Sequence, residues 1–379
     1  MTDAKSVASL AEAELPAGKR FVLLASRLWA WVFLGLMIAF FIVAVPAFGG
    51  ATFFTVRNSQ NILVAITPVL LLGLGQTFVI IAAGIDLSVG WVMSLASVLS
   101  ALAIRASFNA GAPLFLAVFL GFFAAVAGAA IVGLVNGSII AKLKVPAFIV
   151  TLGTSFIVRG VALLLSENTV VIGLPEGIRD YGNESLFYLV RGEGGGFYAF
   201  ERPEVAGELL RRMDRILPYP VLVTAFAVAV CVFLLRKTQF GRHTYAIGGG
   251  LQAALRTGIP VDRHIIKLYV LCSVIAGIAG FLSTLRFTAG SAVIGDALLL
   301  SSIAAVIIGG VSLFGGAGSI MGTVIGALII AVLTTGLVML NVQAFWQFIV
   351  VGIVVIVAVL IDQSRDLIIG RGRSRAGPT

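Results

Sequence analysis

The sequence predicts an all-α, polytopic membrane protein with about ten transmembrane helices. From Ala297 to Ile361 the chain runs 65 residues without Asp, Glu, Lys or Arg, whereas roughly 20 apolar residues are enough to cross a bilayer once. Overall, 59% of the residues are hydrophobic and 11% are charged, against about 25% charged residues in globular proteins. Because lipid offers backbone amides no hydrogen-bond partners, each crossing must be a helix or part of a closed barrel, and such long apolar runs exclude the barrel.

Breaks in the apolar pattern set the expected helices in order along the chain. The helices are expected at residues 28–48, 61–83, 87–105, 114–140, 146–165, 218–235, 267–286, 297–313, 319–340 and 344–362. The run that begins at Leu28 follows four basic residues but lacks a convincing cleavage site, so we expect it to be retained as the first helix. The chain therefore divides into an N-terminal tail (1–27), a transmembrane domain (28–362) and a C-terminal tail (363–379), with long polar loops at 166–217 and 236–267.

The basic residues indicate which side of the membrane each loop occupies. Sixteen of the 26 Lys and Arg residues lie in the N-terminal tail, at Lys142 and Lys144, between Arg236 and Lys267, and after Asp362. Apart from the 166–217 loop, the other side holds only Arg57, Arg105, Arg159 and Arg286. Cytoplasmic loops carry the excess of Lys and Arg, so we expect the first set, with both termini, in the cytoplasm. The net charge of +9 then reflects topology and contact with lipid, and no nucleic-acid partner is expected.

Two segments in opposite halves of the chain are similar to each other. Gly128–Phe148 (GAAIVGLVNGSIIAKLKVPAF) and Gly326–Phe345 (GALIIAVLTTGLVMLNVQAF) share an opening Gly-Ala and a closing Val-x-Ala-Phe when one residue is gapped. In the ten-helix topology the first closing motif faces the cytoplasm and the second faces outward. Opposite orientation is typical of an inverted internal repeat, which is common where a central site opens to alternate sides. A chance match between two apolar segments is the alternative.

Small and polar residues predict close packing and breaks within the membrane. Small residues recur at four-residue spacing at Gly318, Gly322 and Gly326, and at Gly121, Ala125 and Ala129, which favours close helix packing. Two glycine-rich segments, 84–90 and 309–318, predict irregular backbone at membrane depth. Asp86 is the only charge between Asn58 and Ile104, and it either caps the following helix or belongs to a functional path. The candidate path-lining residues are Asp86, Ser88, Asn136 and Thr151.

Catalytic and cofactor chemistry finds little support in the sequence. The two histidines, His243 and His264, lie in the basic 236–267 stretch, and the two cysteines lie in apolar segments. Neither a metal-ligand cluster nor a disulfide framework is therefore predicted. The chain has no G-x-x-x-x-G-K-[ST] phosphate-binding loop. We expect no catalytic residue, no metal and no cofactor on this chain.

The 236–267 stretch contains a candidate for a short exposed helix. The triplet Gly248–Gly250 precedes the helix-forming residues Leu251–Thr257, and Gly258 and Pro260 follow as stop signals. The small side chains of Ala253 and Ala254 would let a groove of another protein close around this helix. A plain solvated helix in a loop is the alternative.

Five segments together resemble one known protein family. They are GQTFVIIAAGIDLSVGWVMSL (Gly75–Leu95), VNGSIIAKLKVPAFIVTLGTSFIVRG (Val135–Gly160), FGRHTYAIGGGLQAALRTGIPVDR (Phe240–Arg263), IAAVIIGGVSLFGGAGSIMGTVIGALII (Ile303–Ile330) and FWQFIVVG (Phe345–Gly352). In this order, and over nearly the whole chain, they are similar to the membrane permease subunits of bacterial ribose-, xylose- and arabinose-type ABC importers, which take up monosaccharides.

The resemblance implies a transport subunit and not an enzyme. It implies a homodimeric pore of two permease copies in the bacterial inner membrane, a cytoplasmic ATP-binding cassette ATPase and a periplasmic sugar-binding protein. The pore would open alternately to the two sides, driven by ATP on the partner chain. The loop helix would dock into the ATPase through Gly249, Gln252, Ala253, Ala254 and Gly258. The alternative is a self-contained secondary transporter, which normally places several acidic residues in its spans.

Three features depart from the family pattern. Gly250, Leu251 and Gln252 stand where the family usually has Asn followed by Glu. Leu299 and Ser301 stand where acidic residues often precede Ile-Ala-Ala-Val, so the polar pore feature of the family is either missing or moved to Asp296. The 166–217 loop is longer than the usual connection.

The 166–217 loop holds nine acidic residues and six arginines. Val205, Leu209, Met213 and Ile216 have helical spacing, which predicts an amphipathic helix over Pro203–Leu217 at the outer surface. Such a helix either covers the pore mouth or anchors the loop to lipid, or it contacts the sugar-binding protein.

Overall fold

The computed structural model describes residues 17–192, 195–203, 209 and 212–368. Over this part of the chain, each of the ten predicted helices is present. They are α2 (Ala17–Ala44), which continues as the π-helical turn η1 (Val45–Gly49), α3 (Val56–Ile81), α4 (Val89–Asn109), α5 (Leu114–Lys142), α6 (Ala147–Leu165), α9 (Tyr219–Lys237), α12 (Val261–Phe287), α13 (Asp296–Ile308), α14 (Ile320–Met339) and α15 (Ala344–Ile368). The connections add α7 (Ile178–Asn183), α10 (Gln239–Gly249), α11 (Leu251–Arg256) and the strands β1 (Ser185–Val190), β2 (Phe197–Ala199) and β3 (Met213–Pro218).

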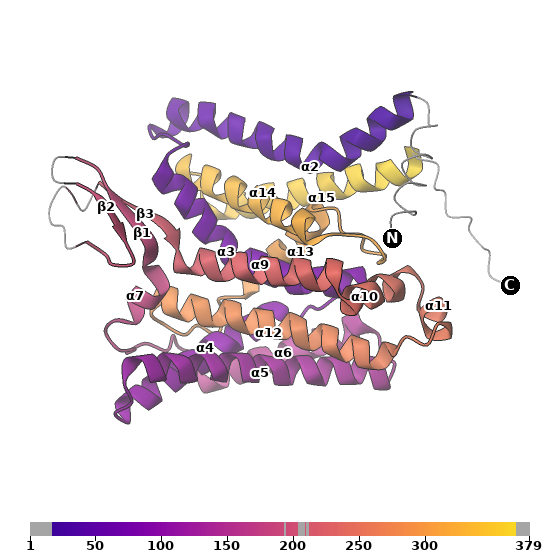
Figure 1. Ribbon diagram of the computed structural model, residues 1–379, viewed down its shortest axis with the longest axis horizontal. Helices are drawn as coiled ribbons and strands as arrows, with labels where there is room; N and C mark the ends of the chain where they lie inside the picture. Colours follow the sequence, from indigo (N-terminus) through magenta and orange to yellow (C-terminus); the bar gives the residue numbers. More distant parts are fainter. Residues whose placement is uncertain (1–16, 193–194, 204–208, 210–211, 369–379) are drawn as a thin grey trace.

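The long helices lie side by side, and the connecting elements gather at the two ends of the bundle. Figure 1 shows the strands and α7 at one end, and α10 and α11 at the opposite end. We call these the sheet end and the α11 end. The start of α2 and the end of α15 both lie toward the α11 end in Figure 1. The first and last helices of the bundle therefore have their outer ends on the same side, as the ten predicted crossings require.

Eight of the described helices are long and apolar enough to cross a membrane. The predicted crossing at 297–313 is wrong in its extent, because α13 ends at Ile308 after 13 residues. At 1.5 Å per residue it spans about 20 Å, less than the roughly 30 Å of a hydrocarbon core. The chain then continues as a loop in which Gly310, Gly315 and Gly316 have φ of +80°, +82° and +73°. Such left-handed backbone favours glycine and ends the helix.

Small residues bring the helices into backbone contact, as the spacing predicts. A Cβ added at Gly326 of α14 would lie 1.9 Å from the carbonyl oxygen of Ala305 in α13. A Cβ added at Gly133 of α5 would lie 2.6 Å from the carbonyl oxygen of Tyr269 in α12. Neither position accepts a side chain without separating two backbones, so glycine allows the close approach of these helices.

The amphipathic helix predicted for Pro203–Leu217 is not observed at its C-terminal end. Met213–Pro218 form β3, which pairs antiparallel with β1, and β1 also pairs with β2, in the order β2-β1-β3. Met213 packs with Tyr188 and Val190 in a small cluster, against which Leu209 also packs. Non-local pairing with β1 overrides the helical spacing of four apolar residues. Val205 lies outside the described residues.

The two Val-x-Ala-Phe motifs lie at opposite ends of the bundle. The first precedes α6 next to Lys144, which forms an ion pair with Asp262 near the start of α12, at the α11 end. The second precedes α15, just after Met339, whose carbonyl lies against Gly49 of η1 at the other end. An inverted repeat requires such opposite placement, and the repeat itself stays a prediction.

Candidate functional site: a cavity at the sheet end

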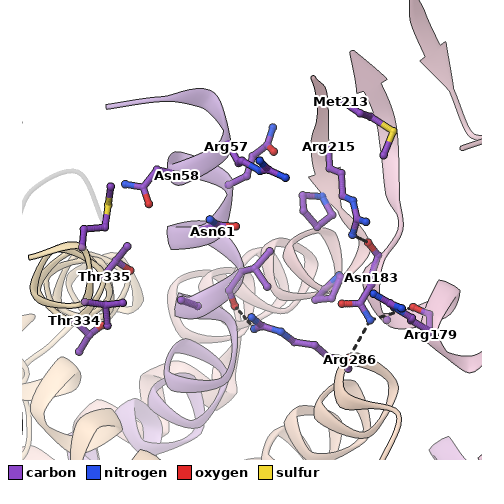
Figure 2. Close-up of a pocket in the computed structure, with 18 of the residues that line it drawn as sticks. Arg57, Asn58, Asn61, Arg179, Asn183, Met213, Arg215, Arg286, Thr334 and Thr335 are labelled. Atoms are coloured by element: carbon purple, nitrogen blue, oxygen red, sulfur yellow. Dashed lines mark hydrogen bonds between the residues drawn. The ribbon is translucent and has the colours of Figure 1, made fainter. Parts of the chain in front are cut away.

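A cavity of about 860 Å³ lies between the first turns of α3, the end of α14 and the sheet. We call it the vestibule. Figure 2 shows its lining, with Arg57 from α3, Arg215 from β3 and Arg286 from α12 around a common space and Thr334 and Thr335 of α14 across from them. Its described charged lining residues are all arginines: Arg57, Arg179, Arg202, Arg215 and Arg286.

The first turn of α3 is fixed by caps. The hydroxyl of Thr55 accepts a hydrogen bond from the amide of Asn58 at 3.1 Å, so Thr55 is an N-cap. The side-chain amide of Asn58 donates to the carbonyl oxygen of Phe53 at 2.7 Å. This first turn carries Arg57, and Asn61 follows one turn later on the same wall. The polar wall of the vestibule is therefore set by local capping.

The opposite wall is held by α7 at the end of α12. Gly182 lies so close to α12 that an added Cβ would be 2.3 Å from the carbonyl carbon of Leu285. The side-chain amide of Asn183 donates to the carbonyl oxygen of Arg286 at 2.9 Å. Arg215 Nη1 donates to the carbonyl oxygen of Asn183 at 2.8 Å, and Arg286 Nη1 donates to that of Val64 in α3 at 3.2 Å. These bonds join β3, α7, α12 and α3 around one space.

The charges around the vestibule interact with one another. Burial lowers the pKa of Arg215, and the nearby charges of Arg202 and Arg179 lower it further. Burial and the charge of Asp180 raise the pKa of Glu184, against the opposing effect of Arg202 and Arg215. Glu184 is near the arginines but does not line the cavity. Five arginines therefore line the vestibule, and the carboxylates of Glu184 and Asp180 lie outside the lining.

A second cavity of about 250 Å³ adjoins the vestibule and is almost wholly apolar. The two cavities share Val64, Pro220 and Arg286. Farther along α3, Leu71, Leu72 and Leu74 are fully buried. The molecule is thus hollow at the sheet end and closely packed along the later turns of α3.

The four candidate path-lining residues are fully buried, and they lie in neither cavity. Asp86 Oδ1 accepts hydrogen bonds from the amide and hydroxyl of Ser88, at 2.9 and 2.6 Å. Asn136 donates to the Ser88 hydroxyl at 2.9 Å, and Thr151 donates to the carbonyl oxygen of Ile85 at 3.3 Å. The structure brings them together in the 82–88 turn before α4. Asp86 therefore closes a local turn on Ser88, which is itself the N-cap residue of α4. Both the capping role and the role in the path stay predictions.

The α11 helix exposes most of the residues predicted to dock a partner. Gly249, Gln252, Ala253 and Gly258 are exposed. Ala254 is not, because it is buried at 2% exposure against Ile247 and Val261. The helix turns this alanine toward its own chain, so Ala254 supports α11 and does not present a surface. Leu251 and Leu255, which the sequence did not single out as contacts, are 47% and 48% exposed.

A chain of backbone contacts joins the α11 end to the interior. The Gly316 amide donates to the carbonyl oxygen of Ile81, the last residue of α3, at 2.8 Å. Gly248 of α10 lies against both of these atoms. Tyr245 of α10 donates to the carbonyl oxygen of Gly318 at 2.7 Å, and burial raises its pKa. The 309–319 loop therefore links α10 to the end of α3, and the other end of α3 lines the vestibule.

Sequence reasoning missed the vestibule residues. Arg57 and Arg286 were noted only as exceptions to the charge asymmetry, and Arg215 only as one of six arginines in a loop. Because Lys and Arg are less frequent on the non-cytoplasmic side of a membrane protein, basic residues on that side are the sequence signal that points to a functional site. Their convergence depends on folding, because they come from α3, α12 and β3. Asp296, the proposed alternative polar position, is exposed at the start of α13.

Comparison with known proteins identifies the family. Residues 58–359 match the family described as branched-chain amino acid transport system, permease component. The ribose import permease protein of Bacillus subtilis (strain 168) is 37% identical over 334 residues, 88% of this chain and 92% of that protein. The xylose transport system permease protein of Haemophilus influenzae is 36% identical over 364 residues, covering 87% and 94%. The D-allose transport system permease protein of Escherichia coli (strain K12) is 34% identical over 329 residues, covering 86% and 90%.

No solved structure matches the chain. The family match covers most of the sequence, and the spans, the apolar exterior and the cavity at one end agree with a protein that lets a solute cross a bilayer. The chain therefore belongs to the family of transport-system permease components and is a multi-pass membrane permease.

Proposed function

We propose that this permease is the membrane subunit of an ABC importer that carries a monosaccharide across the bacterial inner membrane. The similarity to ribose, xylose and allose permeases over 86–88% of the chain carries the proposal. The fold supports it, because a polar vestibule opens at one end of the bundle and the later turns of α3 are closely packed. This is one of the two arrangements that alternating access requires.

The α11 end is proposed to face the cytoplasm, and with it both chain termini. The stretch 236–267 carries six basic residues at this end, as cytoplasmic loops do. The sheet end then faces the periplasm. The domain division follows, with cytoplasmic tails at 1–27 and 363–379, the transmembrane domain at 28–362, the periplasmic loop at 166–217 and the coupling loop at 236–267.

The proposed partners follow from these two ends. A cytoplasmic ATP-binding cassette ATPase would grip α11 through Leu251, Gln252 and Leu255, which are exposed and lie on one short helix. A periplasmic sugar-binding protein would approach the sheet end, and the three-stranded sheet beside the vestibule is the surface that it meets. A second copy of the chain and membrane lipid would cover the apolar side chains exposed along the outer helices.

The contacts described above suggest how the partner's motion reaches the path. Closure of the ATPase would displace α11 and α10, and α10 lies against the carbonyl end of α3. Because α3 is one continuous helix, displacement of its C-terminal end would reach its other end, which carries Arg57 and Asn61. Pro68, inside α3, is where the helix would bend during this motion. ATP can shift the two arrangements only by its differential binding to them.

Reconstitution in sealed vesicles tests the proposal. The chain with its ATPase, and with the binding protein added outside, is expected to accumulate a labelled monosaccharide only with hydrolysable ATP. Vesicles that contain the chain alone, with a proton or sodium gradient, are the control. Accumulation in these control vesicles would identify a secondary transporter instead.

A further inference from the structure

Positive charge lines the vestibule, and the nearby carboxylate of Glu184, whose charge acts on Arg202 and Arg215, stands outside the lining. Its described lining contains five arginines and neither Asp nor Glu. The ion pairs described elsewhere in the chain, Lys144–Asp262 and Arg191–Asp214, involve none of the five. Five guanidinium groups around one cavity repel one another, and the field that they create attracts an anion.

Neutral partners hold the arginines in place. Arg215 and Arg286 each donate to a backbone carbonyl oxygen, that of Asn183 and that of Val64. A guanidinium has five N–H donors in a fixed fork, so one such bond fixes its direction and leaves donors for a ligand. A carbonyl also does not cancel the charge. Both guanidinium groups are therefore positioned and still available to an oxyanion, which arginine binds in bidentate geometry.

Arg215 and Arg286 are half-buried, and the other three lining arginines are exposed. On the proposed orientation they face the periplasm, the side on which membrane proteins carry fewer Lys and Arg residues. Burial and neighbouring charge both disfavour the charged form of Arg215. A neutral sugar needs acceptors as well as donors, and the lining offers it the amides of Gln60 and Asn61 and the hydroxyls of Thr334 and Thr335. The Asn58 amide donates to the carbonyl oxygen of Phe53. The lining is richest in cationic donors.

The size of the cavity favours a small molecule over a protein surface. Sites for small ligands enclose about 300–1,000 Å³, and the vestibule encloses about 860 Å³. Its arginines line a concavity, as Figure 2 shows. Arg286 also lines the smaller, mostly apolar cavity that adjoins the vestibule, so this one arginine borders both cavities.

We infer that the vestibule receives a cargo of monosaccharide size that carries an oxyanion, such as the carboxylate of a sugar acid. The inference rests on the proposed function and specifies its substrate class. It assigns Arg57, Arg215 and Arg286 as the groups that hold the anion.

Ligand binding by the purified full chain tests the inference. The chain in nanodiscs of zwitterionic lipid is titrated with sodium glucuronate, with glucose and with inorganic phosphate at equal ionic strength, and thermal unfolding reports binding. Glucuronate is expected to raise the unfolding temperature and glucose is not. A smaller effect of phosphate is expected, because phosphate lacks the sugar ring. Equal effects of phosphate and glucuronate would overturn the sugar-acid assignment.

Matched variants locate the site. Arg57→Gln and Arg286→Gln are each expected to weaken glucuronate binding about tenfold or more, because a hydrogen bond to a charged group is lost. Arg105→Gln is the control, because Arg105 is partly exposed, donates to the carbonyl oxygen of Ile172 and does not line the vestibule. Arg57 is exposed, so its substitution leaves the fold intact.

Three results would overturn the inference. They are equal binding of glucose and glucuronate, glucuronate binding that survives in both arginine variants, and no shift with glucuronate. If the last result came with salt-sensitive, arginine-dependent association of the binding protein, the arginines would serve protein docking instead. Failure of the proposed function would appear separately, as ATP-independent uptake in vesicles, and would leave this binding result unchanged.

Discussion

Gly248 and Gly249 are adjacent glycines in α10 with opposite surroundings. A Cβ added at Gly248 would lie 1.7 Å from the carbonyl oxygen of Ile81 and 2.6 Å from the amide nitrogen of Gly316. Ordinary contact begins near 3.4 Å, about twice the first distance. Both obstructing atoms belong to the backbone and cannot rotate away. A Cβ added at Gly249 meets nothing within 4 Å.

Gly248→Ala is expected to separate α10 from the end of α3. Overpacking costs typically about 1–3 kcal/mol, and disruption of the bond from Gly316 to Ile81 costs about 1 kcal/mol more. The better helix propensity of alanine offsets up to about 1 kcal/mol. The net loss of stability is about 1–3 kcal/mol. Gly249→Ala retains only the propensity gain, so it is expected to be neutral or stabilising by less than about 1 kcal/mol.

Thermal unfolding of the two purified variants in the same detergent measures the difference. Gly248→Ala is expected to unfold at a clearly lower temperature than Gly249→Ala. In reconstituted vesicles it is also expected to lose ATP-driven uptake while ATPase binding persists, since α11 remains exposed. If Gly248→Ala unfolded at the same temperature as Gly249→Ala and kept the ATP-driven uptake of the unsubstituted chain, the packing of α10 against the end of α3, and the proposed coupling through it, would be refuted.

Substitutions at three further positions distinguish residues that contact a partner from residues that stabilise the fold. Leu255→Glu changes a side chain that is 48% exposed on α11, so pull-down should show loss of ATPase binding with unchanged unfolding temperature; a destabilised variant would place Leu255 in the fold. Ala254→Leu overfills a buried site and should lower stability by about 1–3 kcal/mol, measured in the same melt; unchanged stability would mean that Ala254 is exposed. Asp86→Asn keeps an acceptor for the amide and hydroxyl of Ser88. It should destabilise the fold less than Asp86→Leu, which leaves both donors unpaired at a cost of about 1–3 kcal/mol. Equal unfolding temperatures of the two variants would contradict a role of these contacts in holding the turn before α4.

The helices of the bundle follow from local sequence because lipid leaves the backbone no other partner. The uncharged run from Ala297 to Ile361 has to satisfy its amides within each segment. The structure accordingly places α13, α14 and α15 in it. Small residues such as Gly326 also revealed close packing, because only a missing side chain lets two backbones approach. Neither feature needs knowledge of distant neighbours.

The sheet and the burial of α11 depended on distant neighbours. Met213 and Ile216 have helical spacing, yet they form a strand because β1 offers them hydrogen bonds. Ala254 looked like a contact residue by its size, but the register of a six-residue helix turned it toward Ile247 and Val261. Propensity and spacing are weak determinants in such short segments, where tertiary partners decide.

From the sequence alone one could establish the membrane location, the order of the long helices and the family resemblance, because each depends on composition, local periodicity or contiguous motifs. The vestibule required tertiary structure. Arg57, Arg215 and Arg286 are separated by more than seventy positions from one another, and only the packing of α3, α12 and β3 brings them to one cavity. Electrostatic attraction depends on distance, so these three arginines can attract one anion together only after folding has brought them close to one another.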